Sequence, residues 1–124
     1  MKLILPALLA VAGLAAATPA PAAQNSCFRM SDIRNHTVAD AHTLYLSVGS
    51  KDVQKVTMAG ACLAASSGSD PLITESTGGS GLVCRPLDLN LKIDTAGGIS
   101  PCIIKSIEKL SPEQIAAIPK KLRP

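Results

Sequence analysis

The sequence predicts one small, mainly β domain, an antiparallel barrel or curled sheet with one short C-terminal helix and two disulfides. Two observations predict this fold class. Apolar and polar residues alternate in "LDLNLKI" (87–93) and in "TLYLSV" (43–48), as they do in strands that place one face on a core. Four cysteines also stand within about 100 residues, a length at which a hydrophobic core commonly needs cross-links.

The alternation also predicts which side chains face inward. In 43–48 the inward residues are Leu44, Leu46 and Val48, so Tyr45 points outward as a cross-strand packing partner or a possible contact residue. In 87–93 the predicted inward residues are Leu87, Leu89, Leu91 and Ile93. Apolar runs predict further strands at 27–33, 53–58 and 102–107, with weaker candidates at 72–74 and 82–84.

Composition predicts the segments between and after the strands. Residues 61–81 are rich in Gly and Ser, which predicts a long flexible loop. Near the C-terminus, Ser111 is a helix cap, Pro112 fits the first turn, and Gln114 completes a capping box. Pro119 ends this helix, and residues 119–124 are predicted to form a solvated basic tail.

The N-terminus has the pattern of a secretory signal peptide. Lys2 precedes an apolar run at 3–17, and Ala20-Pro21-Ala22 gives the small-residue pattern of a cleavage site. We therefore expect a signal peptide at 1–22, a single domain at 23–124, and a periplasmic or secreted bacterial protein. No segment of 23–124 is long and apolar enough to predict a membrane span.

Charge and aromatic content argue against nucleic acid as a partner. Without Lys2 the chain has eleven Lys and Arg against nine Asp and Glu, so it is only weakly basic. Phe28 and Tyr45 are the only aromatic residues on which bases could stack. The sequence also lacks the glycine-rich motifs that hold nucleotide phosphates, and no cofactor is expected.

The cysteines predict structural disulfides. Cys27, Cys62, Cys84 and Cys102 allow three pairings, and no C-x-x-C spacing points to a redox pair or a zinc knuckle. The expected strand order favours Cys27–Cys102, joining the first and last main strands, and Cys62–Cys84, closing the Gly/Ser-rich loop.

Four residues near the start of the domain have metal-ligand chemistry: Asp32, His36, Asp40 and His42. A helix would place 32, 36 and 40 on one face, but Asn35, Thr37 and Val38 form helices poorly and the segment lacks the apolar period of a helix. The segment is therefore predicted to be a strand-to-strand connection whose histidines are solvated, and no metal is expected. No serine has the spacing of a nucleophile elbow either.

The order of cysteines and strands is similar to that of a known family. The segments "CFRMSDI", "DAHTLYLSV", "GACLA", "GLVCRPLDLNLKI" and "PCIIKSIEKL" carry the similarity, together with Asp40 and Asp88. They resemble the exported bacterial four-cysteine family called domain of unknown function 6491, from Cys27 to about Leu110. The resemblance implies an exported protein and this fold class, and it implies no catalytic residue.

The leading functional hypothesis is an exported, non-catalytic accessory or binding domain. Its exposed strand faces and the 61–81 loop would contact an envelope protein or a small ligand. Two alternatives remain: a small metal-assisted hydrolase that uses the region of His36 and His42, and a thiol-active periplasmic protein.

Overall fold

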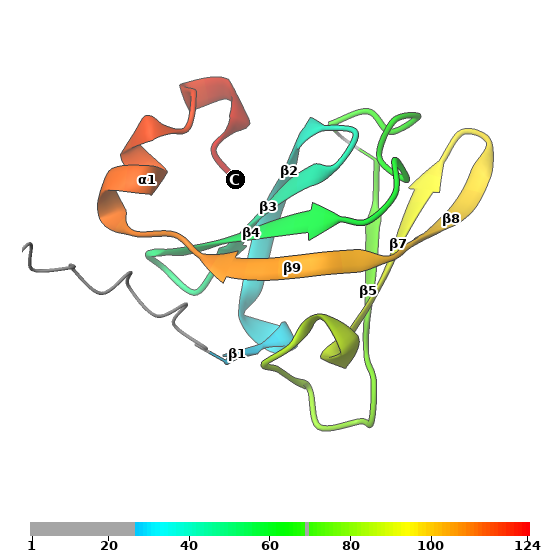
Figure 1. Cartoon of the computed structure of the whole chain (residues 1–124), viewed down its shortest axis with the longest axis horizontal. Helices are drawn as coiled ribbons and strands as arrows, with labels where there is room; N and C mark the ends of the chain where they lie inside the picture. Colours follow the sequence, from blue (N-terminus) through cyan, green and yellow to red (C-terminus); the bar gives the residue numbers. More distant parts are fainter. Residues whose placement is uncertain (1–26, 69) are drawn as a thin grey trace, which may run out of the picture.

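The structure is a computed structural model that describes residues 27–68 and 70–124. Its strands form three antiparallel sheets, and one short α-helix lies near the C-terminus (Figure 1). The predicted signal peptide at 1–22 and the first four residues of the predicted domain lie outside the described residues.

The largest sheet has four strands in the order β2-β3-β4-β9. Its strands are β2 (Ile33–Asp40), β3 (Thr43–Val48), β4 (Asp52–Met58) and β9 (Ile104–Lys109). Leu44, Leu46 and Val48 are buried on its inner face, whereas Tyr45 points to the outer face. The strand predicted at 43–48 and its inward residues are therefore confirmed.

The second sheet has the order β5-β7-β8 and shares a continuous stretch of chain with the first. Its strands are β5 (Leu72–Ser76), β7 (Leu89–Thr95) and β8 (Gly98–Cys102). Only Ile103 separates β8 from β9, so residues 98–109 pair with β7 at one end and with β4 at the other. Strand β5 confirms the weak candidate at 72–74, and it lies inside the segment predicted to be a loop.

The third sheet is a two-residue ribbon near the start of the described chain. β1 (Phe28–Arg29) pairs with β6 (Leu82–Val83), and the 3-10 turns η1 (Met30–Asp32) and η2 (Pro86–Asp88) follow these strands. Phe28 and Val83 are buried, so each strand of the ribbon sends one side chain into the core.

One hydrophobic core joins the three sheets. It contains Phe28, Leu44, Leu46, Val48, Val56, Met58, Leu63, Val83, Leu89, Leu91, Ile93 and Cys102. The mainly β fold class with one helix and two disulfides is thus confirmed. The described strands form no closed barrel, because β2 and β5 each end a sheet.

The C-terminal helix begins where the capping box predicts. α1 (Pro112–Ala117) starts after Ser111, whose side chain accepts a hydrogen bond from the Gln114 amide at 3.2 Å, while Gln114 accepts from the Ser111 amide at 2.8 Å. The helix covers the outer face of the four-stranded sheet through a second apolar cluster. That cluster contains Val53, Leu110 and Ile118, with Tyr45, Ile115 and Leu122 packed against it.

Residues 119–124 were predicted to form a solvated tail, but hydrogen bonds hold them against the domain. They contain η3 (Lys120–Leu122), and Thr37 Oγ1 donates a hydrogen bond to the Leu122 carbonyl. Arg123 donates from Nε to the Ile118 carbonyl at 2.9 Å and from Nη2 to the Ala116 carbonyl at 2.8 Å. Arg123 therefore satisfies carbonyls at the end of α1, while the two lysines remain exposed.

Three further predictions of local structure are wrong. The strand predicted at 27–33 is the two-residue strand β1, followed by the 3-10 turn η1. The segment expected to be a connection, which holds Asn35, His36 and Thr37, is the eight-residue strand β2. Leu87 lies in η2 and is 79% exposed, so it does not belong to the inward set of the following strand. Asp88 explains why Leu87 is exposed, because the Asp88 side chain accepts hydrogen bonds from the amides of Cys84 and Arg85 and so stabilises a turn around Leu87.

The predicted disulfide pairing is also wrong. The bonds are Cys27–Cys84 and Cys62–Cys102, in place of Cys27–Cys102 and Cys62–Cys84. Cys27 precedes β1, which pairs with β6, and this antiparallel register carries it to Cys84. Cys62 meets Cys102 because β8 and β9 run past the end of β4, where Ala59 donates to the Ile103 carbonyl at 2.8 Å.

Candidate functional site

The four predicted metal-ligand candidates lie along β2 and the turn after it. Asp32 precedes β2 and Asp40 ends it, so this eight-residue strand separates them by about 25 Å. Asp40 and His42 do meet, in the turn between β2 and β3, where the His42 amide donates to Asp40 Oδ1 at 2.8 Å. No group of three or more His, Cys, Asp or Glu side chains among residues 27–68 and 70–124 is placed to hold a metal ion.

Both histidines contact main-chain carbonyls at the two ends of one segment. His42 Nδ1 lies 3.0 Å from the Gly60 carbonyl oxygen, and His36 Nε2 lies 3.2 Å from that of Asp70. Cys62 and the buried Leu63 anchor the chain between these points. The histidines thus attach the segment after β4 to the first two strands of the large sheet.

The amide hydrogen bond from His42 lowers the pKa of Asp40 below its ordinary value. The carboxylate accepts this bond as part of a local turn between two paired strands. The structure therefore gives Asp40 a turn-forming contact, and it gives the two histidines contacts with the main chain.

Tyr45, the possible contact residue, is half-buried on the outer face of the large sheet. It packs against the cluster formed by Val53, Leu110 and Ile118, beneath the C-terminal helix. Its cross-strand neighbours are Thr37 and Lys55. Tyr45 therefore helps to hold α1 on the sheet.

Two of the four exposed large hydrophobic residues in the described part of the chain, Ile99 and Ile103, lie on β8 or directly after it. Ile99 and Pro101 share the outer face of β8, and the exposed Ile103 follows directly after the strand. We call these three residues the apolar ridge. Ile99 is 61% exposed and Ile103 74% exposed, while Cys102 points to the core. Figure 1 shows the β7–β8 hairpin at the opposite end of the molecule from α1.

The ridge lies on an edge strand that resists pairing. The Asp94 amide donates to the Pro71 carbonyl on the β5 side, so the neighbouring residues of β7 bond toward β8. Asp94 and Lys92 face Ile99 and Pro101, whose main-chain groups therefore point away from β7. Because Pro101 has no N–H, this edge lacks a donor in its middle. A partner thus fits the side-chain face of β8 better than its edge.

Charged groups beside the ridge are not equally paired. Lys92 Nζ lies 3.6 Å from Glu75 Oε2, which also accepts a hydrogen bond from Asn90 at 3.3 Å. The exposed Asp94 stands directly across from Ile99, and its carboxylate has no hydrogen bond or ion pair within the described part of the chain. The ridge is therefore bordered by one carboxylate that is available to a cation.

Sequence reasoning missed the ridge. The signal was present in "GISPCI", where Ile99, Pro101 and Ile103 alternate around a cysteine that must point inward to form its bond. The predicted last strand begins at Cys102, which places Ile99 and Pro101 outside any strand and separates them from Ile103.

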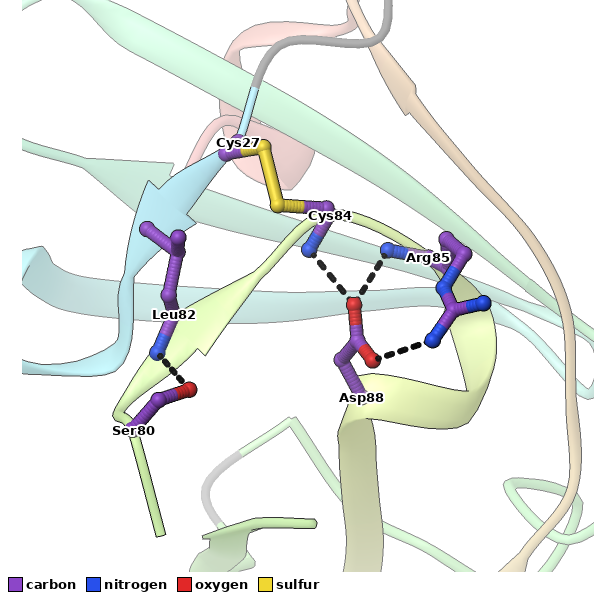
Figure 2. The surroundings of a disulfide bond; sticks show 6 residues. All are labelled: Cys27, Ser80, Leu82, Cys84, Arg85 and Asp88. Atoms are coloured by element: carbon purple, nitrogen blue, oxygen red, sulfur yellow. Dashed lines mark hydrogen bonds and ion pairs between the residues drawn. A yellow bond between two sulfur atoms is a disulfide. The ribbon is translucent and has the colours of Figure 1, made fainter. Parts of the chain in front are cut away.

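Asp88 organises the chain around the first disulfide (Figure 2). Its Oδ2 accepts hydrogen bonds from the amides of Cys84 at 3.0 Å and Arg85 at 2.9 Å, and its Oδ1 lies 3.4 Å from Arg85 Nη2. These bonds favour the carboxylate form, so the Cys84 and Arg85 amides, followed by the Arg85 side chain, lower the pKa of Asp88.

We expect Asp88→Asn to lower stability at neutral pH and to flatten its dependence on pH. A carboxyl whose pKa is lower in the folded state stabilises the fold above its unfolded pKa, about 3.9. This contribution is lost as the pH falls through the folded pKa. Urea unfolding between pH 2 and 7 should therefore show the variant and the wild type converging at the acid end.

Asp94→Asn is the matched control, because that side chain makes no hydrogen bond in the described chain. It should leave the difference between acid and neutral stability unchanged. A constant gap between Asp88→Asn and the wild type across the whole pH range would contradict the assigned role of the carboxylate.

Within the described residues, no helix is long and apolar enough to cross a membrane. No protein-family model, curated protein or solved structure matches the chain. The resemblance to domain of unknown function 6491 therefore stays a prediction, and the functional inference rests on the described residues themselves.

Proposed function

We propose that the protein is an exported, non-catalytic binding domain that docks an envelope protein on the apolar ridge of β8. The observation that carries this proposal is the exposure of Ile99 and Pro101 on β8 and of Ile103 directly after it, where a disulfide at Cys102 fixes the chain. A contiguous exposed apolar feature of this kind marks interaction surfaces in soluble proteins. The disulfides agree with an oxidising compartment, which the N-terminal sequence also predicts.

The expected partner presents an apolar strip bordered by a Lys or Arg. The apolar strip would cover Ile99 and Ile103, and the cation would pair with Asp94, the carboxylate beside the ridge. Pro101 makes strand addition at this edge unfavourable, so the contact would be between side-chain faces.

Position-specific photocrosslinking in the native cell tests the proposal. A benzoylphenylalanine placed at Ile99 or Ile103 should crosslink to another protein, while the same group at the exposed Glu113 on α1 should not. Asp94→Lys should reduce the crosslink, because it places a cation opposite the cation of the partner. Absence of a crosslink at both ridge positions, or a crosslink only to a second copy of the chain, would overturn the proposal.

A further inference from the structure

The disulfide Cys27–Cys84 joins two strands directly across from one another. Phe28 pairs with Val83 and Arg29 with Leu82, so Cys27 and Cys84 form the next antiparallel position, with their Cα atoms 4.2 Å apart. Figure 2 shows the bond at the end of this ribbon. The bond therefore lies at the margin of the domain, where β1 begins.

The two disulfides differ in how far an external thiol can reach them. Cys27 is exposed and Cys84 half-buried, whereas Cys102 is buried at 8% exposure and contributes to the core. Cys62 is half-buried and packs against that core. Because thiol–disulfide exchange requires a thiolate to reach a sulfur atom, Cys27 offers the most accessible point of attack.

Contacts other than the disulfide hold the two cysteines together. Phe28 and Val83 are buried beside them, and the Met30 amide donates to the Gly81 carbonyl at 2.8 Å. Asp88 holds the Cys84 amide independently of the sulfur. After opening, both thiols would remain opposite one another in the ribbon, so closure would be an intramolecular reaction favoured by proximity.

We propose that Cys27–Cys84 is an exchangeable disulfide that accepts a low-molecular-weight thiol at Cys27 while Cys62–Cys102 stays closed. The incoming thiolate attacks Cys27 Sγ and forms a mixed disulfide, and the electron pair of the broken S–S bond passes to Cys84 Sγ as a thiolate. The Cys84 thiolate can then attack Cys27 Sγ and release the original thiolate. Alternatively, a second external thiolate attacks the sulfur of the first thiol in the mixed disulfide, which releases the Cys27 thiolate and an oxidised thiol dimer.

Exposure of the oxidised protein to reduced glutathione tests this proposal. Samples are quenched with N-ethylmaleimide and mapped by mass spectrometry. Cys84 should become alkylated, with Cys27 carrying glutathione or the label, at least about tenfold faster than Cys62 and Cys102 are alkylated. Amide hydrogen exchange on the same samples should show that β3 and β4 remain protected. Simultaneous opening of both bonds, earlier opening of Cys62–Cys102, or loss of protection when Cys27–Cys84 opens would each overturn the proposal.

Variants with one cysteine replaced compare how readily glutathione reaches each of the two sulfur atoms. With oxidised glutathione, the Cys27 thiolate in the Cys84→Ser variant should form a mixed disulfide, with release of reduced glutathione, faster than the Cys84 thiolate in the Cys27→Ser variant. The reverse order would contradict the greater accessibility of Cys27 from which attack at that sulfur is inferred. As a control, Cys62→Ala combined with Cys102→Ala should leave the opening rate of Cys27–Cys84 unchanged if that variant folds. The wild-type experiment decides the proposal even if these variants do not fold.

Discussion

Reduction of both disulfides should unfold the domain at room temperature without denaturant. The bonds close sequence separations of 57 and 40 residues. On the chain-entropy model each bond removes about 4 kcal/mol of unfolded-state freedom. The two loops overlap between Cys62 and Cys84, so their contributions are not additive, but even one is large beside a net stability of about 5–15 kcal/mol.

Far-UV circular dichroism and amide hydrogen exchange with excess reductant would measure this effect. Protection in β3 and β4 should fall to that of an unfolded chain, and oxidised protein in the same buffer is the control. The urea midpoints of the double variants Cys27→Ala/Cys84→Ala and Cys62→Ala/Cys102→Ala would then show how much each disulfide contributes to stability. A fully reduced protein that keeps native protection would show that the core alone sustains the fold.

The local sequence pattern was sufficient to predict β3 and α1, whose stabilising contacts involve residues close in sequence. β3 has one face in the main core and follows strict alternation, so its bounds and inward residues were predictable. Helix α1 was predictable because Ser111 and Gln114 form their capping box within four residues of chain. In both cases the stabilising contacts are readable from neighbouring residues.

β2 was not predictable, because it is an edge strand with mixed surroundings. Its residues are half-buried or exposed, and polar side chains on both faces bind the rest of the chain. Thr37 binds the carbonyl of Leu122 and His36 lies against that of Asp70. Such distant main-chain partners leave no period in the local sequence.

The disulfide pairing could not be predicted because it depends on two strands that are distant in sequence and too short to recognise by pattern. β1 and β6 have two residues each, and only their register brings Cys27 to Cys84. The apolar ridge was missed for a related reason, since the expected strand boundary at Cys102 divides a continuous stretch that serves two sheets. The sequence therefore predicted the fold class but not the surface on which the proposed partner docks.

Leu91→Ala should destabilise the domain by about 3 kcal/mol, within the range for leucines removed from closed cores. Leu91 is 0% exposed in β7, the central strand of its sheet, and it pairs with Thr74 on one side and Cys102 on the other. The paired strands and the disulfide at Cys102 restrict collapse around the missing side chain, so a cavity should remain.

Leu87→Ala is the matched control, because it makes the same chemical change four residues earlier at a side chain that is 79% exposed. It should change the free energy of unfolding by no more than about 0.5 kcal/mol. Urea unfolding of the oxidised proteins, followed by circular dichroism, would compare the two midpoints at constant slope. Equal losses in the two variants would mean that Leu87 joins the inward set, as simple alternation predicts, and that η2 does not form.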